Sequence, residues 1–200
     1  MNSTDNKTAV HRQSLRRLLT DPPVVAMLAV LLLGAAWTVF SRVQDGSPPP
    51  AEAPPSPRKG FAAPDFTLET LDGNTLKLSE LRGRPVILNL WASWCAPCRI
   101  EMPAIQRVHE RHSDDGLVVV GLNSTVQDSE TAARAFADEY GLTFPIALDR
   151  DGSVSALYEL TALPSTYFID RNGIIRDVII GGPMSEAAML SNVETLLQEP

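Results

Sequence analysis

Short apolar runs alternate with amphipathic stretches over the last two thirds of the chain. Residues 66–69 and 75–78 alternate apolar and polar side chains around Asp72-Gly73-Asn74, which predicts a β-hairpin. The nearly all-apolar run 85–91 predicts a strand that is covered on both faces. Further strands are expected over 117–122, 144–148, 166–169 and 174–179, helices over 96–112, 129–140, 152–159 and 185–197, and a capped helical turn over 79–83. This order predicts an α/β domain with a mixed sheet.

A different pattern occupies the N-terminal part. No charged residue occurs from Pro22 to Ser41, and a helix of that length would span about 30 Å, one hydrocarbon core. The preceding residues are basic, so the positive-inside rule predicts a cytoplasmic N-terminus and an exported remainder. A signal peptide cleaved near Gly34-Ala35-Ala36 is an alternative, although its apolar region would be shorter. A third interpretation is a buried helix of a soluble domain. Such a helix would show a polar stripe, and this segment shows none.

Prolines dominate the stretch that follows. Six of the sixteen prolines lie within residues 44–60, which favours an extended polyproline II conformation. At about 3.1 Å per residue, such a tether would reach on the order of 50 Å. The sequence therefore predicts a cytoplasmic tail over 1–21, a transmembrane anchor over 22–41, a proline-rich linker over 42–60 and a folded domain over 61–200.

Composition and charge narrow the function classes. Apolar residues make up 44% of the chain, enough for a packed core. The net charge is -7, and residues 61–200 carry twenty acidic residues against ten basic ones. A domain this acidic repels phosphate backbones, so nucleic-acid binding is not expected. Two cysteines are too few for a disulfide-rich scaffold, so the pair needs a chemical explanation.

The two cysteines form the motif Cys95-Ala96-Pro97-Cys98 between the buried strand and a helix. Cys95 is expected at the helix N-terminus, where unpaired backbone N–H groups and the helix dipole lower the pKa of a thiol. Cys98 lies one turn further in and should be less exposed and less acidic. This asymmetry suits a nucleophile and a resolving thiol. Cys95 would attack a disulfide of another protein, and Cys98 would then attack Cys95 and release the reduced partner.

The cysteine pair has two other interpretations. A zinc site could combine it with His109 and His112, whose spacing approaches that of a zinc finger. A continuous helix would hold these histidines roughly 20 Å from the thiols, and we expect both to face solvent. The second interpretation is a structural cysteine pair without redox activity. The bulky Trp94 and the position of the pair at an element boundary argue against it.

The motif and its surroundings resemble the thioredoxin superfamily. The similarity lies in Trp94-Cys95-Ala96-Pro97-Cys98 after an apolar strand, in Leu163-Pro164-Ser165-Thr166 and in the Asn172-Gly173 hairpin. Residues 89–103 are similar to the membrane-anchored TlpA/ResA/DsbE group, and the match covers roughly 61–198. The resemblance implies a thioredoxin fold with an N-terminal β-hairpin extension and a central αβ insertion, preceded by one transmembrane helix. The insertion is expected within residues 124–148.

The resemblance also implies site residues besides the cysteines. Pro164 matches the position that is a cis-proline in thioredoxin folds, where it would align a substrate backbone against Cys95. Glu101 falls on the inward stripe of the helix, where burial would raise its pKa, and it could exchange protons with Cys98. The alternative is an edge glutamate paired with Arg99.

Other residues near the motif have weaker assignments. Asn89 stands where general thioredoxins carry a buried Asp, and an amide cannot act as a base, which shifts proton transfer towards Glu101. Trp94 is expected to shield one face of the dithiol, whereas Trp91 could equally belong to the core. The predicted client-binding residues are Trp94, Ala96, Pro97 and Leu163.

The implied function is a thiol–disulfide oxidoreductase on the outer side of a cell membrane. It would reduce proteins such as apocytochrome c or a copper chaperone, using electrons from an integral-membrane dithiol carrier. No metal, and no cofactor beyond the Cys95–Cys98 disulfide, is expected. An oxidant that introduces disulfides and a copper- or zinc-binding module remain alternatives. A copper-binding chaperone of the Sco type would need Cys-x3-Cys and a later histidine, and a peroxidase would need a threonine in place of Ala92.

Overall fold

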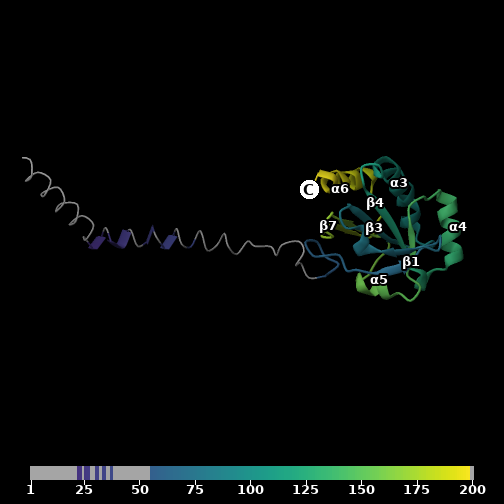
Figure 1. Ribbon diagram of the computed structural model, residues 1–200, viewed down its shortest axis with the longest axis horizontal. Coiled ribbons are helices and arrows are strands. Elements are labelled where there is room, and N and C mark those ends of the chain that lie inside the picture. The colour runs from purple at the N-terminus through teal and green to yellow at the C-terminus, as the bar shows by residue number, and fades with distance from the viewer. Residues whose placement is uncertain are drawn as a thin grey trace, which may run out of the picture. The chain divides into compact units, whose positions relative to one another are not determined.

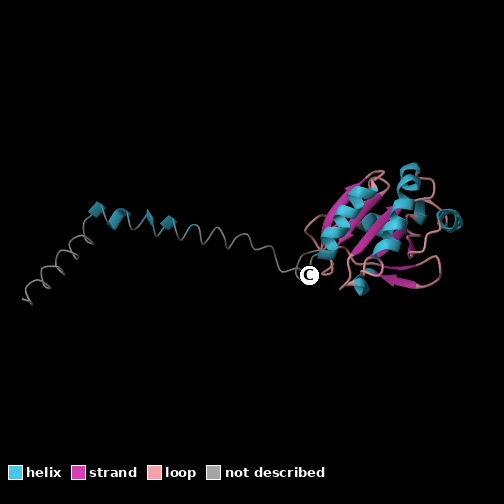
Figure 2. Cartoon of the chain, turned by 90° about the horizontal axis from the view of Figure 1, so that it is seen from above, coloured by secondary structure: helices cyan, strands magenta, loops and turns pink. Residues whose placement is uncertain are grey.

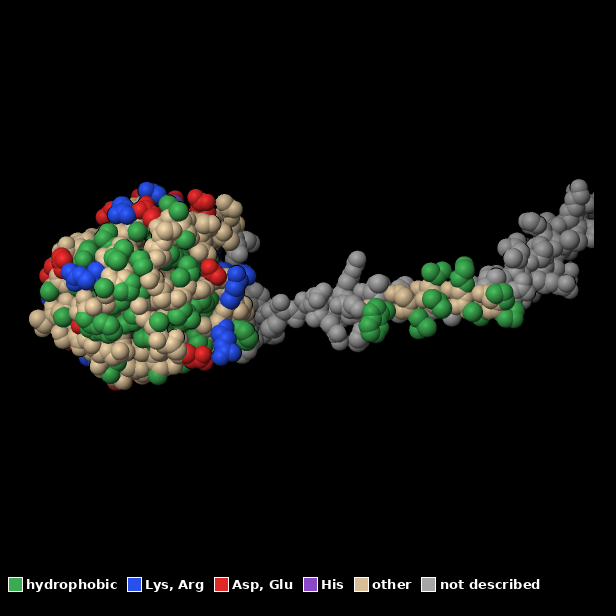
Figure 3. All heavy atoms as spheres, turned by 180° about the vertical axis from the view of Figure 1, so that it is seen from behind, with side chains coloured by type: hydrophobic (Ala, Val, Ile, Leu, Met, Phe, Trp, Pro, Cys, Tyr) green, Lys and Arg blue, Asp and Glu red, His purple; other side chains and the backbone are tan. Residues whose placement is uncertain are grey.

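The computed structural model describes residues 55–198 and, before them, residues 22, 23, 25–27, 30, 31, 33, 34 and 37. The chain divides into two units, Met1–Ser47 and Pro48–Pro200. The predicted tail, most of the predicted linker and part of the predicted anchor lie outside the described residues. The described positions of the first unit are helical, and their large apolar side chains are exposed (Figure 3). Within the described residues, no helix is long and apolar enough to cross a membrane.

A mixed five-stranded sheet lies at the centre of the second unit (Figures 1 and 2). Its strands are β3 (Val86–Trp91), β4 (Val118–Asn123), β5 (Ile146–Leu148), β6 (Ser165–Ile169) and β7 (Ile175–Ile180), in the order β5-β4-β3-β6-β7. β3 and β4 are parallel, as are β4 and β5, whereas β6 is antiparallel to both β3 and β7. The apolar run that predicted a strand covered on both faces is the central strand β3, and all its residues are buried.

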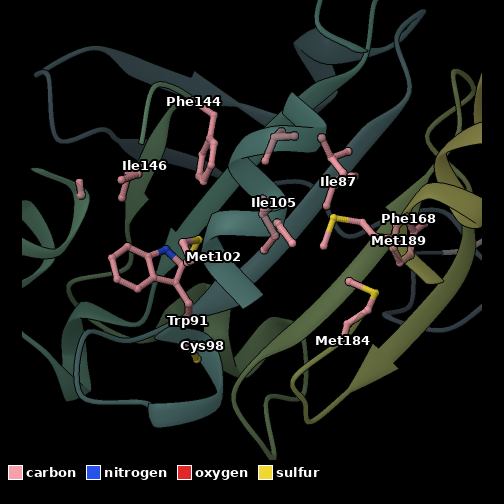
Figure 4. Close-up of a cluster of buried hydrophobic side chains, with 14 of the residues drawn as sticks. Ile87, Trp91, Cys98, Met102, Ile105, Phe144, Ile146, Phe168, Met184 and Met189 are labelled. Atoms are coloured by element: carbon pink, nitrogen blue, oxygen red, sulfur yellow. The ribbon is translucent and has the colours of Figure 1, made fainter. Parts of the chain in front are cut away.

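Helices and a hairpin cover the two faces of this sheet. The helices are α3 (Ala96–His112), α4 (Glu130–Tyr140), α5 (Ser153–Leu157) and α6 (Glu186–Gln198). In Figure 1, α3 and α6 lie together on one side of the sheet, and α5 and β1 lie on the other. Ile87 and Trp91 point into the apolar cluster beneath α3 that Figure 4 shows, and Leu88 and Leu90 point into the opposite one. Because side chains alternate along a strand, Asn89 faces α3.

The predicted α/β order is confirmed, and so is the N-terminal hairpin. Strands β1 (Thr67–Glu69) and β2 (Thr75–Lys77) pair antiparallel, with Leu68 opposite Leu76. The stretch 124–148, predicted as an insertion, contains the short 3-10 helix η3 (Thr125–Gln127), then α4 and β5. Its strand β5 extends the sheet beyond β4 and forms the sheet's edge.

Two local expectations are corrected by the structure. The helical turn expected over 79–83 is a 3-10 helix over Leu78–Leu81, and the Ser79 N–H donates to the Asp65 carboxylate at 2.8 Å. The cap therefore comes from a distant residue, because the chain folds back on itself here. Residues 55–60, counted with the linker, contact the domain: the Gly60 N–H donates to the Ile175 carbonyl at 2.8 Å.

Candidate active site

The dithiol lies where the chain passes from β3 into α3. Cys95 immediately precedes α3, and its Sγ accepts a hydrogen bond from the Cys98 backbone N–H at 3.3 Å. The two sulfurs are joined at 2.05 Å, so the structure shows the oxidised state. Cys95 is 3% exposed and Cys98 is fully buried at one end of the apolar cluster (Figure 4). The order of exposure of the two cysteines agrees with the prediction.

The start of α3 supplies an electropositive environment for Cys95. The first turn of this helix contains no acidic residue, and its backbone N–H groups lack partners within the helix. Pro97 lies in this turn, where its missing N–H costs little. Ala96 is exposed and Pro97 is half-buried, so a partner can approach the disulfide from this side. A thiol in such a position at a helix N-terminus is stabilised in its thiolate form.

Gly182 packs closely against both Pro164 and Glu101, the glutamate of α3. The Leu163–Pro164 peptide bond is cis, as expected. The Gly181 N–H donates to the Pro164 carbonyl at 2.8 Å. A Cβ on the next residue, Gly182, would lie 2.8 Å from Pro164 Cγ and 3.1 Å from Glu101 Oε2. Glycine is therefore required at this position for the loop to approach both residues. Leu163 is half-buried against the apolar cluster that contains both cysteines.

Glu101 lies inside the domain, one turn after Cys98. It is 1% exposed, and its carboxylate accepts hydrogen bonds from Asn89 Nδ2 and from the Met184 backbone N–H, both at 2.9 Å. Burial raises the pKa of Glu101, and these two hydrogen bonds only partly oppose it. The alternative of an edge glutamate paired with Arg99 is therefore wrong. Arg99 instead pairs with Glu139 of α4 at 2.7 Å. A carboxyl group with a raised pKa beside a thiol can exchange a proton with it.

Asn89 connects this carboxylate to β6. Its Nδ2 donates to Glu101 and, at 2.8 Å, to Thr166 Oγ1. The Asn89 side chain is fully buried, and its Oδ1 has no hydrogen-bond partner. The amide therefore donates a hydrogen bond to Glu101 but cannot act as an acid or a base. This geometry supports the sequence argument that Asn89 leaves proton transfer to Glu101.

The two tryptophans beside the dithiol have different environments. Trp91 is fully buried in the core, and its ring lies 4.5 Å from that of Phe136, centroid to centroid. Trp94 is 58% exposed, and its Nε1–H donates to the Gln127 carbonyl at 2.8 Å. Trp94 therefore lies at the surface next to Cys95, anchored to the inserted segment by its indole nitrogen.

The zinc interpretation is excluded by the helix. Cys98 and His109 lie eleven residues apart on the continuous helix α3, which separates them by about 16 Å. The expectation that both histidines face solvent holds only in part, because both are half-buried. The His109 ring packs edge-on against Phe144, and His112 Nδ1 lies 2.9 Å from an Asp115 carboxylate oxygen. Within the described residues, no cluster of three or more His, Cys, Asp or Glu side chains is placed to hold a metal ion.

Sequence reasoning missed several residues that complete the site. They come from distant segments and contact the site through backbone atoms or short polar side chains: Asp128, Gln127, Thr166, Gly182 and Met184. Gly181-Gly182-Pro183 was visible as a turn signal, and Asp128-Ser129 as a helix start. Neither signal says which part of the fold the segment contacts.

The fold and the site together define a class. A mixed α/β domain with a Cys-x-x-Cys disulfide at the N-terminus of the helix after its central strand, and a cis-proline before the next antiparallel strand, is a thioredoxin-like thiol–disulfide oxidoreductase. The chain belongs to the AhpC/TSA family, whose family model matches residues 60–178.

Individual relatives agree with this class. The chain is 34% identical over 185 residues to the thiol-disulfide oxidoreductase ResA of Oceanobacillus iheyensis, covering 90% of each chain. It is 45% identical over 125 residues to the thioredoxin-like protein YneN of Bacillus subtilis, covering 62% of this chain and 72% of that protein. A Chlorobium tepidum structure that carries the name thiol:disulfide interchange protein DsbE superposes with a TM-score of 0.66 at 32% identity, covering 71% of this chain and 99% of the other. The resemblance to the ResA and DsbE group is confirmed.

Proposed function

We propose that this protein is a membrane-anchored, extracytoplasmic reductant of protein disulfides. The observation that carries the proposal is the asymmetry of the dithiol. Both sulfurs are buried in the oxidised state, but Cys95 lies at the N-terminus of α3, whereas Cys98 lies one turn further in, on the helix that also carries the buried Glu101. One sulfur is thus placed to ionise and attack, and the other to be deprotonated in a second step.

The proposed reaction passes two electrons and two protons to the client. The Cys95 thiolate attacks a client disulfide, the client S–S bond breaks, and the displaced client thiolate takes up a proton. Cys98 then gives its proton to Glu101 and attacks Cys95 Sγ. This step breaks the mixed disulfide and releases the second client thiolate, which is also protonated. The remaining Cys95–Cys98 disulfide is the oxidised state of the structure.

The client would bind across the surface around Cys95. Trp94 and Ala96 are exposed, and Pro97 and Leu163 are half-buried. We assign these residues to client contact, and we assign Pro164 to aligning the client backbone. The four client-contact assignments rest on the resemblance to thioredoxin folds and on the accessibility of the side chains, whereas Pro164 is buried and its assignment rests on the resemblance alone.

The proposed location rests on the N-terminal sequence. Residues 22–41 lack charge and follow a basic segment, which favours an anchor with the folded domain outside the cytoplasm. The part of the proline-rich linker before residue 55 would then hold the domain away from the membrane. The resemblance to the TlpA/ResA/DsbE group supports clients such as apocytochrome c or a copper chaperone, and an integral-membrane dithiol carrier as electron donor.

The direction of electron flow is tested by the reduction potential of the full chain in detergent, equilibrated with glutathione buffers. A reductant requires a potential no higher than that of the glutathione couple, about -220 to -260 mV. A potential near about -120 mV would make the protein an oxidant and overturn the proposed direction. Trapping with Cys98→Ser in intact membranes, followed by mass spectrometry of the mixed disulfides, identifies the client.

A further inference from the structure

The loop that leads into the dithiol is held by the inserted segment. The Ser93 backbone N–H donates to Asp128 Oδ2 at 2.6 Å, and the Ser93 hydroxyl donates to Asp128 Oδ1 at 2.7 Å. The next residue, Trp94, donates its indole N–H to the Gln127 carbonyl. Asp128 lies 35 residues after Ser93, between η3 and α4. Two neighbouring residues of the insertion therefore fix the two residues that precede Cys95.

The Asp128 carboxylate is fully used by its donors. Besides the two bonds from Ser93, it accepts hydrogen bonds from Asn123 Nδ2 and from the Ser129 backbone N–H, each at 2.9 Å. Two carboxylate oxygens offer about four acceptor positions, so four donors occupy them. An asparagine here would point its N–H groups at some of these donors. Partial burial works to raise the pKa of Asp128, but the hydrogen bonds outweigh it and hold the pKa below its ordinary value.

Ser93 is also fixed at its carbonyl. Arg99 Nη1 donates to the Ser93 carbonyl at 3.3 Å, while its other terminal nitrogen donates to both Glu139 oxygens at 2.7 and 2.8 Å. The Arg99 guanidinium also lies over the Phe136 ring, 5.2 Å from its centroid. The amide, hydroxyl and carbonyl groups of Ser93 are thus all engaged, and Asp128 accepts from two of them.

We propose that Asp128 is a positioning residue for Cys95. By fixing Ser93, it holds the short loop in the one arrangement that places Cys95 Sγ over the Cys98 N–H at the start of α3. The thiolate of the reduced protein depends on that placement, because the helix field falls off within one turn. The insertion then has a chemical role in setting the reactivity of the nucleophile.

Removal of the Asp128 carboxylate should change the pKa of Cys95 in opposite directions, depending on whether Asp128 acts through its charge or by positioning Ser93. The charged groups in contact with the loop are Asp128 and Arg99, and Arg99 is paired with Glu139; Glu101 lies inside the domain after Cys98. If the negative charge of Asp128 acted only through space, its removal would stabilise the Cys95 thiolate and lower its pKa. If Asp128 acts through Ser93, its removal loosens the loop and raises that pKa.

The test measures how Cys95 reacts in the reduced full chain. This inference rests on the proposed role of Cys95 as nucleophile. Wild type, Asp128→Ala and Asp138→Ala are alkylated with iodoacetamide from pH 5 to 10, and the modified peptide is quantified by mass spectrometry. Asp138 is an exposed acidic residue of α4 and serves as the matched control. For Asp128→Ala we expect the pKa of Cys95 to rise by about one unit, with insulin reduction at neutral pH roughly tenfold slower.

The outcomes separate this inference from the proposed function. A wild-type Cys95 that titrates like a free thiol would overturn the assigned nucleophile, whatever Asp128 does. A depressed wild-type pKa that stays the same or falls further in Asp128→Ala would overturn the positioning role alone. Ser93→Ala, which removes only the hydroxyl hydrogen bond, decides the matter if Asp128→Ala does not fold. A raised pKa with alkylation roughly threefold slower supports positioning, and an unchanged profile contradicts it.

Discussion

Glu101→Gln separates the chemical role of the buried carboxylate from its effect on stability. The carboxylate is 1% exposed, and its two hydrogen bonds come from Asn89 Nδ2 and the Met184 N–H. Glutamine has nearly the same shape and is neutral, so it imitates the protonated carboxyl group. The substitution removes the ability to gain or lose a proton, but the new amide NH2 must face one of the two N–H donors, Asn89 Nδ2 or the Met184 N–H, and loses that hydrogen bond at every pH.

The stability effect of Glu101→Gln follows from linkage. Burial raises the pKa of Glu101 in the folded protein above its ordinary value of 4.5, so the folded state binds the proton more tightly than the unfolded chain does. The contribution of Glu101 to stability is therefore fully present below pH 4.5 and is lost as the pH rises through the folded pKa. Each unit by which a folded pKa exceeds the unfolded one lowers the free energy of unfolding at neutral pH by about 1.4 kcal/mol. The variant lacks this loss, so its free energy of unfolding should rise relative to that of wild type as the pH goes from acidic to neutral.

Glu101→Gln should also change the rate at which a mixed disulfide is resolved. Without Glu101, Cys98 must lose its proton to solvent, so resolution of a mixed disulfide on Cys95 should slow on the order of 10²-fold at neutral pH. Its pH dependence should then follow the ionisation of Cys98. The assay loads Cys95 with a chromogenic aromatic thiol and follows the release of that thiol from pH 5 to 10. Urea unfolding of the oxidised protein over the same pH range gives the stability.

Two outcomes would refute this reasoning. An unchanged pH profile for release would remove Glu101 from proton transfer. A variant whose free energy of unfolding falls relative to that of wild type between acidic and neutral pH would show that ionisation of the carboxylate stabilises the fold, contrary to the raised pKa. Glu194→Gln is the matched control because Glu194 is exposed on α6, and both measurements should stay at wild-type values.

Three further predictions concern the same site. Cys95→Ser should abolish insulin reduction, whereas Cys98→Ser should accumulate mixed disulfides on non-reducing gels; absence of any trapped species would remove the resolving role of Cys98. Gly182→Ala brings a Cβ within 2.8 Å of Pro164 Cγ and should lower the unfolding free energy by about 1–3 kcal/mol in urea titrations; unchanged stability would contradict the close approach. Asn89→Leu removes a hydrogen bond that lowers the pKa of Glu101, so the pH profile for release should move to higher pH; a move to lower pH would contradict this assignment.

Local patterns were enough to predict the elements that carry the chemistry. The apolar run before the motif predicted the central strand β3, and the helical periodicity after it predicted α3 with its observed bounds. Glu101 could be placed on the buried face because residues three apart share one side of a helix. These inferences depend on contacts within one element or between adjacent ones, which the spacing of residues determines.

The remainder of the site depends on contacts between distant segments. Met184 lies 83 residues after Glu101, and Thr166 lies 77 residues after Asn89. Their positions follow from the order of β3, β6 and β7 in the sheet, which no local pattern contains. His109 illustrates the same limit: its place on the helix favoured solvent, but Phe144 of the insertion packs against it. Asp128 looked like an ordinary residue at a helix start, and its contact with Ser93 appears only in the folded domain.

The acidity of Cys95 is the central claim of the account. It is measured most directly in the reduced full chain, by following the alkylation rate of that one sulfur against pH. The structure predicts a pKa clearly below about 8.5, the value of a free thiol, because Cys95 occupies the N-terminus of α3. A pKa at or above that value, or a reduced Cys95 that reagents cannot reach, would contradict the account.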